Sequence, residues 1–277
     1  MSISAKDVKK LREQTGAGMM DCKKALQEAN GDFEEATDIL RKKGQQLSEK
    51  RADREANQGL IVSRVSDDGK KAAALEINCE TDFVARNDDF QDRAQQFIDI
   101  VFENEVESVD ALMDIEIDGL SVSQHLKEMV GKIGEKIKIS RIVFAETDGY
   151  YISYIHPGNQ LGVLVEFEDA ISDEKIGRNI AMQVAAMDPV AVTRDGVDSS
   201  VVEQELEIAK DQLLNEGKSE EIAEKAAQGK LRKFYEQNVL LEQKFVKDNS
   251  LTVENYLDEN DTPLVKSFHR LQLGNDS

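Results

Sequence analysis

Residues 60–79, LIVSRVSDDGKKAAALEINC, decide the type of fold that this chain adopts. The run Leu60-Ile61-Val62 is apolar and rich in β-branched residues, which favour an extended strand. The tripeptide Asp67-Asp68-Gly69 is typical of a tight turn, and the chain then returns through an apolar stretch from Ala72 to Cys79. We therefore predict an antiparallel β-hairpin within a fold that mixes sheets and helices.

Downstream of this hairpin, a pattern of strands followed by a helix occurs twice. An amphipathic helix follows the hairpin, with its apolar side at Phe90, Ala94, Phe97 and Val101, and a shorter helix lies near residues 122–133. Three further strands and a last helix are predicted at 137–145, 150–155, 161–167 and 176–187. The fold class is therefore α+β, with a core of two related α/β subdomains, 56–145 and 146–277, built on small antiparallel sheets.

Upstream of the hairpin, the first 44 residues are predicted to form three short helices. Ser4 followed by Asp7 has the spacing of a capping box, and Gly44 is a candidate cap at the end of the third helix. The second helix is expected to bury one row of side chains: Met19, Cys22, Leu26 and Ala29. With a polar helical connector, this gives a three-helix N-terminal domain over residues 1–55.

A protruding antiparallel helical hairpin is predicted at residues 198–237, inserted in the second subdomain. Its first helix repeats apolar residues with the spacing of a coiled-coil seam: Val202, Leu206, Ala209 and Leu213. Its second helix follows a turn at Gly217 and is expected to use another row of side chains: Ile222, Ala226, Gly229 and Lys233. Because so narrow a seam is marginal alone, we expect the hairpin to pack against a second copy of the chain, as a homodimer, or against another protein, or to remain without a substantial partner.

The charge of the chain argues against nucleic acid as a direct partner. There are 35 basic and 55 acidic residues, a net charge of −20, whereas binding to DNA or RNA requires many phosphates to be neutralised by Lys and Arg. The most basic stretch, residues 42–54, also carries Glu49 and Asp53, and we interpret it as ordinary solvated surface.

The compartment is predicted to be the cytoplasm. No apolar run approaches the roughly 20 residues of a membrane span, so we expect no membrane partner, and the first ten residues do not resemble a signal peptide. The two cysteines, Cys22 and Cys79, form no CxxC pair and no disulfide framework, which suits a reducing environment.

The chain is not expected to be an enzyme and is expected to need no metal or cofactor. It lacks the zinc, P-loop, dinucleotide-binding and nucleophile-elbow motifs. The best enzymatic alternative is a dyad of Cys79 and His156, but Glu80 and Asp82 would disfavour a thiolate at Cys79. We interpret Cys79 as a small core residue.

Two segments are candidates for recognition, each with a structural alternative. Met20 is rotated by about 100° from Met19 on the second helix, so it either faces outward as an adaptable contact or packs under the preceding glycine loop. Phe83, in the segment 78–87 between a strand and a helix, is either a wedge on a rigidly held loop or a cap on the core beneath it.

Six segments of the chain resemble the elongation factor Ts family, the guanine-nucleotide exchange factors for the GTPase elongation factor Tu. They occur in family order as LREQTGAGMMDCKKALQEANGDFEEA, NCETDFVARN, KIGEKIKISRI, GVLVEF, NIAMQVAA and, more weakly, KSEEIAEKAAQGKLRKF. The resemblance implies a ubiquitin-associated-like N-terminal domain. It also implies that GDP is exchanged for GTP on the partner. Some members carry a further C-terminal helical module, which we expect to be missing here.

The resemblance also assigns residues to the contact with the GTPase. The family motif TDFV corresponds to Thr81, Asp82, Phe83 and Val84. In that family the Asp and Phe of the motif contact the GTPase near its Mg²⁺ site. The contact dislocates the Mg²⁺ ion. The remaining implied contacts are Met19, Met20 and His156, the last of which is followed here by Pro157. The alternative is a protein-binding adaptor without exchange activity, which would leave the TDFV segment without a role.

Overall fold

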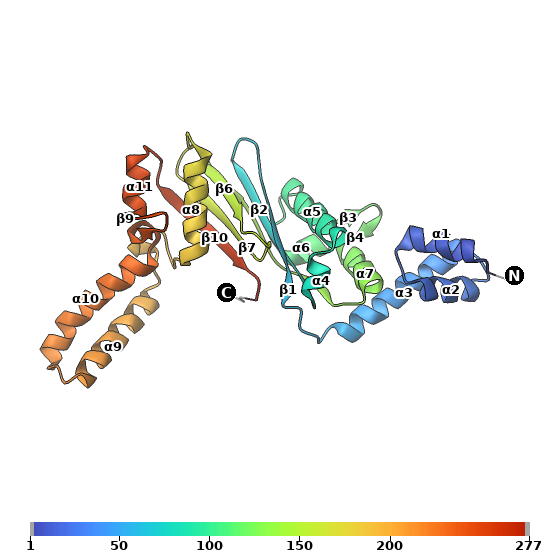
Figure 1. The fold of residues 1–277 in the computed structure, drawn as a ribbon, viewed down its shortest axis with the longest axis horizontal. Coiled ribbons are helices and arrows are strands. Elements are labelled where there is room, and N and C mark those ends of the chain that lie inside the picture. Colours follow the sequence, from blue (N-terminus) through green and yellow to red (C-terminus); the bar gives the residue numbers. More distant parts are fainter. Residues whose placement is uncertain (1–2, 275–277) are drawn as a thin grey trace.

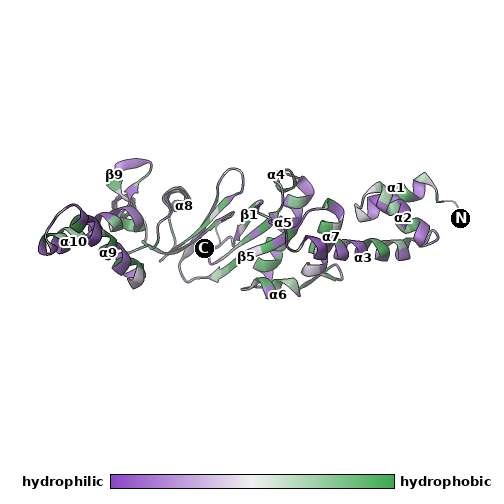
Figure 2. Cartoon of the chain, turned by 90° about the horizontal axis from the view of Figure 1, so that it is seen from below, coloured by the Kyte–Doolittle hydropathy of each residue, from purple (hydrophilic) through white to green (hydrophobic). Residues whose placement is uncertain are grey.

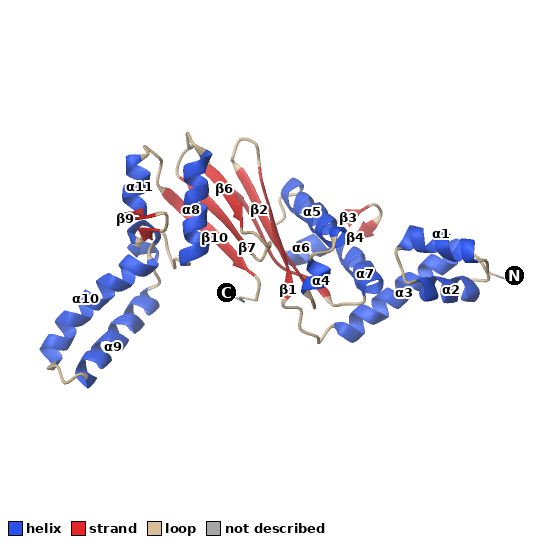
Figure 3. Cartoon of the chain, in the orientation of Figure 1, coloured by secondary structure: helices blue, strands red, loops and turns tan. Residues whose placement is uncertain are grey.

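The computed structural model describes residues 3–274 and shows an elongated molecule (Figure 1). A three-helix unit occupies one end, a helical hairpin occupies the other, and two small antiparallel sheets with covering helices lie between them (Figure 3). This combination confirms the predicted α+β class. The predicted domain limits at residues 1–2 and 275–277 lie outside the described part of the chain.

The three-helix unit consists of α1 (Ala5–Thr15), α2 (Met19–Glu28) and α3 (Phe33–Arg51). The predicted capping box is confirmed, since Ser4 Oγ accepts from Asp7 N at 3.1 Å. The small core of the unit is made by Val8, Leu11, Cys22, Ala25, Leu26, Ala29 and Ala36. Its likeness to ubiquitin-associated domains stays a prediction.

Two predictions for the three-helix unit are wrong. Met19 is not buried but 54% exposed, because α2 begins at this residue and its inner side runs through Cys22 and Leu26. Gly44 does not end the third helix: α3 continues to Arg51, and Gly44 is buried within it. The backbone of α7 (Val122–Ile133) approaches Gly44 closely, so this position has no room for a side chain.

The first sheet has the strand order β1-β2-β5, with antiparallel neighbours throughout. Its strands are β1 (Gln58–Val65), β2 (Lys71–Cys79) and β5 (Ile137–Glu146). The predicted hairpin is confirmed. Gly69 in its turn has φ 71°, and a side chain there would collide with the Tyr150 ring, so the position suits glycine on both counts.

Both faces of the central strand β2 are covered, which explains why its sequence is apolar almost throughout. Leu75, Ile77 and Cys79 face a helical layer formed mainly by α5 (Asp88–Glu103) and α7 (Val122–Ile133). The alternate residues Ala72 and Ala74 face the second sheet. The short elements between α5 and α7 were not predicted, because segments of two to five residues carry no periodicity. They are α6 (Val109–Met113), β3 (Glu116–Ile117) and β4 (Leu120–Ser121).

The second sheet has the order β10-β7-β6, with α8 (Glu174–Met187) packed on its outer face. Its strands are β6 (Tyr150–Ile155), β7 (Leu161–Phe167) and β10 (Val265–Gln272). The strands β6 and β7 and the helix α8 confirm the predicted elements. The tail also forms β8 (Lys244–Phe245), β9 (Asp248–Thr252) and α11 (Val253–Glu259).

The two sheets pack face to face through a small apolar layer. Ile61 of β1 contributes from the first sheet, and Tyr151, Leu164 and Leu271 contribute from the second. Asn159, in the loop after β6, accepts a hydrogen bond at 2.7 Å from Ile61 N through its carbonyl oxygen. This contact ties the β6–β7 loop to the edge of β1.

The helical hairpin is formed by α9 (Ser199–Asn215) and α10 (Glu220–Asn238). The predicted seam on α9 is confirmed at Ala209 and Leu213, whereas the predicted seam on α10 is correct at Ala226, which is partly buried, and wrong at its other positions. Ala223, Ala227 and Leu231 are the buried residues there, whereas Ile222 is exposed and Gly229 faces open space. A shift of one residue turns the inner side of a helix by about 100°. Pairing with a second copy through this hairpin stays a prediction.

Candidate partner-binding surface

The TDFV segment forms a single helical turn, α4 (Asp82–Ala85), between β2 and α5. The strand before it ends at the buried Cys79, and Thr81 is the N-cap of the turn. Val84 is partly buried against the core of the first sheet and holds the inner side of α4 in place. The inner side of α4 is therefore anchored to the core of the first sheet.

Phe83 points away from that anchor and is 82% exposed, the largest exposed fraction among the large apolar side chains of residues 3–274. This excludes the interpretation that Phe83 caps the core. An aromatic ring held in water is unfavourable compared with a buried one. Phe83 is therefore free to enter a partner, as the wedge interpretation requires.

Glu135, between α7 and β5, fixes the start of this turn. Its carboxylate accepts from Thr81 N at 3.0 Å and from Thr81 Oγ1 at 2.7 Å. The two hydrogen bonds run to separate carboxylate oxygens, so they fix both the position and the orientation of Thr81.

Glu80 forms a second anchor beside the first. Its carboxylate accepts at 2.6 Å from Arg51 Nη1, at 2.9 Å from Arg54 Nη1 and at 2.6 Å from Lys136 N. Burial raises the pKa of Glu80, but these hydrogen bonds outweigh burial and lower that pKa to about 2. The end of α3 is thus tied to the residue that precedes TDFV. This corrects our interpretation of the basic stretch at 42–54 as purely solvated surface.

Asp82 lies at the first position of α4 and is about half exposed. Its carboxylate pairs with Arg86 Nη2 at 2.9 Å, one turn along. Both side chains are exposed, and such pairs contribute only about 0–1 kcal/mol. The carboxylate therefore remains accessible to a partner.

Met19 and Met20 form a separate apolar surface at the start of α2, with exposed fractions of 54% and 62%. The alternative in which Met20 packs under the glycine loop is thereby excluded. In the view of Figure 2, α4 and the pair α1–α2 lie on the same side of the molecule.

A cleft of about 720 Å³ lies between α4 and the turn that leads from α1 to Met19, although Met19 and Met20 do not themselves line it. Phe83 and Val84 border it on one side, and Thr15 and Gly16, just before α2, border it on the other. Its floor includes Met129 of α7. The end of α1 and the helical turn α4 therefore face a common space.

His156 lies on a third element, the exposed loop between β6 and β7. Its Nδ1 is 2.9 Å from the hydroxyl oxygen of Tyr154. The same loop is bonded to β1 through Asn159 and Ile61, and β1 begins opposite Cys79, where β2 ends. His156 thus lies on a loop of the second sheet that is bonded to β1 of the first sheet.

The enzymatic alternative is not supported by the surroundings of Cys79. The thiol is buried and lies 3.1 Å from the carbonyl oxygen of Thr81, whereas His156 is bonded to Tyr154. Burial, followed by the negative charge of Glu135, raises the pKa of Cys79 to about 12. Such a thiol carries almost no thiolate at neutral pH.

Two observations concern metals and membranes. In the described range 3–274, no group of three or more His, Cys, Asp or Glu side chains is arranged to hold a metal ion. Within the same residues, no helix combines the length and the apolar character needed to cross a bilayer.

The anchors Glu80 and Glu135 were missed by the sequence reasoning. Glu80 stands beside TDFV, and Glu135 lies in the segment KIGEKIKISRI. The only available signal was that both are acidic residues in segments that carry the family resemblance. Their partners are 29 and 54 residues away in the chain, so no local pattern could identify them.

Comparison with known proteins gives a consistent result. A family model described as elongation factor TS matches residues 80–275. The chain is 45% identical over 277 residues to the elongation factor Ts of Amoebophilus asiaticus, with 99% of this chain and 100% of that protein covered. It is 46% identical over 284 residues to that of Prosthecochloris aestuarii, with 98% and 99% covered. It is 42% identical over 278 residues to that of Porphyromonas gingivalis, with 100% of each covered.

Proposed function

Because this chain belongs to the elongation factor Ts family of translation factors, we propose that it binds the GDP-bound GTPase elongation factor Tu and accelerates the exchange of GDP for GTP. Elongation factor Ts is a nucleotide exchange factor and catalyses no covalent chemistry. The observation that carries the proposal is the exposure of Phe83 on a helical turn that is anchored on its inner side.

The mechanism follows from linkage. If the exchange factor binds the nucleotide-free GTPase more tightly than the loaded form, then bound nucleotide and bound exchange factor weaken each other by the same factor. A GTPase holds its nucleotide through Mg²⁺ and the backbone N–H groups of a phosphate-binding loop. A ring wedged between helices beside that loop displaces the Mg²⁺ ligands, so GDP dissociates faster.

Burial of the Phe83 ring can supply the free energy for such a wedge, and the fixed helical turn supplies the rigidity. Burying a Phe side chain contributes about 1.5–3 kcal/mol. Thr81 and Val84 already hold α4 in place, so binding orders little additional chain. Much of this burial energy is therefore available to distort the partner.

The other candidate residues have roles that fit their positions. The carboxylate of Asp82 would repel or compete with ligands of the metal. Met19 and Met20 would form an adaptable apolar contact with a helix of the partner, and His156 would contact it from the second sheet. Each of the three domains would thus supply one contact with the partner: residues 1–55 through Met19 and Met20, residues 56–145 through Asp82 and Phe83, and residues 146–277 through His156.

The strongly acidic surface would act before contact is made. A net charge of −20 steers the protein toward basic partner surfaces and away from nucleic acid. We place the protein in the cytoplasm, where translation factors meet their GTPase.

Release of fluorescently labelled GDP from elongation factor Tu tests the proposal. The full chain should accelerate release by orders of magnitude at saturation. Phe83→Ala should remove most of that acceleration. Ile222→Ala, which truncates another exposed apolar side chain on the hairpin, should keep it. If the chain binds the GTPase but leaves the rate of GDP release unchanged, the protein is an adaptor and the proposal is wrong.

A further inference from the structure

The end of α7 contacts residues next to both of the surfaces proposed to contact the partner. Gly131 lies under α3 of the three-helix unit, Lys132 lies against the loop that leads to Met19, and Glu135 holds Thr81 next to Phe83. These three contacts come from five consecutive residues, 131–135, which we call the α7 end segment.

The contact between α7 and α3 is made backbone to backbone. A Cβ atom added to Gly131 would lie 2.9 Å from Gly44 Cα, and one added to Gly44 would lie 3.0 Å from Lys127 O and 3.4 Å from Gly131 Cα. Carbon atoms in contact prefer about 3.5–4.0 Å. Any side chain at Gly131 must therefore push the two helices apart.

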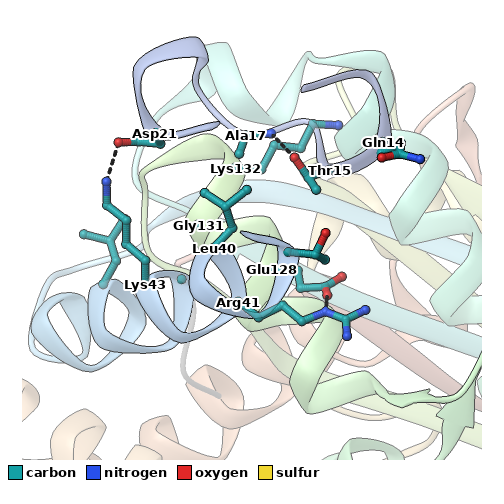
Figure 4. Close-up of a pocket in the computed structure, with 13 residues that line it drawn as sticks. Gln14, Thr15, Ala17, Asp21, Leu40, Arg41, Lys43, Glu128, Gly131 and Lys132 are labelled. Atoms are coloured by element: carbon teal, nitrogen blue, oxygen red, sulfur yellow. Dashed lines mark hydrogen bonds and ion pairs between the residues drawn. The ribbon is translucent and has the colours of Figure 1, made fainter. Parts of the chain in front are cut away.

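The remaining contacts around this crossing keep the three-helix unit in one orientation. Arg41 Nε donates to Glu128 Oε1 at 2.9 Å on one flank. On the same flank a small pocket of about 190 Å³ lies among α2, α3 and α7, and Ala17 and Leu40 line it together with Arg41 and Glu128 (Figure 4). The crossing lies at the edge of this pocket, since Gly44 and Gly131 both line it.

Lys132 extends the same contact to the loop before α2. Its Nζ donates to Asp89 at the start of α5 at 2.7 Å. A Cβ atom added to Gly16 would come within 2.5 Å of Lys132 Cε, so the aliphatic part of Lys132 lies directly on the Gly16 backbone. Gly16 is three residues from Met19.

We propose that the α7 end segment is a positioning element, which sets the spacing between the Met19–Met20 surface and Phe83 so that both engage one partner molecule at once. This inference rests on the proposed function and adds a role for residues that do not themselves contact the GTPase. Two surfaces held at a fixed spacing bind as one, because the second contact costs no further ordering.

The decisive variant is Gly131→Ala, with Gly229→Ala as its matched control. Both changes add one methyl group to a helix, but Gly229 has no atom within 4 Å of the added Cβ. Spin labels at Lys24→Cys on α2 and Gln95→Cys on α5 report the spacing by electron resonance, since the native cysteines are buried. Gly131→Ala should shift or broaden the distance distribution, and Gly229→Ala should leave it unchanged.

A double-mutant cycle then tests the link to binding. Gly131→Ala should weaken the affinity for nucleotide-free elongation factor Tu by about tenfold. In a Met19→Ala/Met20→Ala background the same change should have an effect below about twofold, because the contact that it misplaces is already absent. A merely destabilising substitution would instead weaken both backgrounds equally.

The outcomes separate this inference from the proposed function. The label distances require no partner, so an unchanged spacing in Gly131→Ala overturns the positioning role even if exchange proceeds as proposed. A changed spacing with unchanged affinity overturns it as well. If the wild-type chain does not accelerate GDP release, the proposed function fails instead. Should Gly131→Ala unfold in a thermal melt, Gly44→Ala, which meets backbone at 3.0 Å rather than 2.9 Å, replaces it in both measurements.

Discussion

Glu135 holds Thr81 through both of its carboxylate oxygens, at 3.0 Å to the backbone nitrogen and 2.7 Å to the hydroxyl oxygen. The two residues come from different elements, and the bond fixes the turn that presents Phe83. Glu135→Ala should therefore loosen α4 and slow stimulated GDP release by about tenfold or more, since a hydrogen bond to a charged group contributes about 1.5–3 kcal/mol and about 1.4 kcal/mol corresponds to a factor of ten. Glu135→Gln keeps one acceptor oxygen, so its rate of stimulated GDP release should lie between those of the wild-type protein and Glu135→Ala. Exchange at the wild-type rate by Glu135→Ala would show that the turn holds its shape without this bond.

Phe83 and Val84 are neighbours with opposite surroundings, and their variants should differ accordingly. Phe83→Ala should abolish most of the exchange activity but change the free energy of unfolding by no more than about 0.5 kcal/mol, because the ring is exposed. Val84→Ala should cost about 1 kcal/mol of stability, because Val84 packs against the core. Denaturant unfolding and GDP release, measured on both variants, check the pair. A large loss of stability in Phe83→Ala would contradict its assignment as a wedge.

Asp82 tests whether the wedge acts with the help of charge. Asp82→Asn keeps the size of the side chain and removes the negative charge near the proposed position of the metal. We expect slower GDP release with almost unchanged stability, because the ion pair with Arg86 is exposed. Arg86→Gln removes the positive partner of the same ion pair but keeps the Asp82 carboxylate, and it should leave the rate of GDP release unaffected. Full activity of Asp82→Asn would rule out a role for the charge.

Glu80 should make the free energy of unfolding depend on pH in the acidic range. Its pKa in the folded state is about 2, below the ordinary value of 4.5. The ionised carboxylate therefore stabilises the fold fully above about pH 4.5, and this contribution is lost as the pH falls from there toward 2. The difference in unfolding free energy between the wild-type protein and Glu80→Gln should shrink over that range. A difference that stays constant from pH 6 to pH 2 would contradict the anchor.

Cys79 should be chemically inert in the folded protein. Its pKa is raised to about 12, first by burial and then by the charge of Glu135. Iodoacetamide at pH 7.5 should leave Cys79 unmodified by mass spectrometry, whereas modification should be rapid in denaturant. Rapid modification of the native protein, with loss of exchange activity, would revive the enzymatic alternative.

The sequence by itself determined the elements that depend on neighbouring residues. The hairpin at residues 60–79, the capping box at Ser4 and the strands β6 and β7 follow from periodicity and turn chemistry, which act over a few residues. The resemblance identified the family and the TDFV segment. The open question of whether Phe83 points inward or outward depends on what lies beneath α4, and the sequence could not answer it.

Tertiary structure alone decided how distant segments meet. Gly44 lies inside α3 rather than at its end, and α7 crosses α3 there at Gly131. The inner side of α10 runs through Ala223 rather than Ile222 because α9 lies on that side. Glu80 and Glu135 became anchors through partners 29 and 54 residues away. Each of these contacts is set by the packing of whole elements, and local propensity contains no information about which surfaces will be brought together.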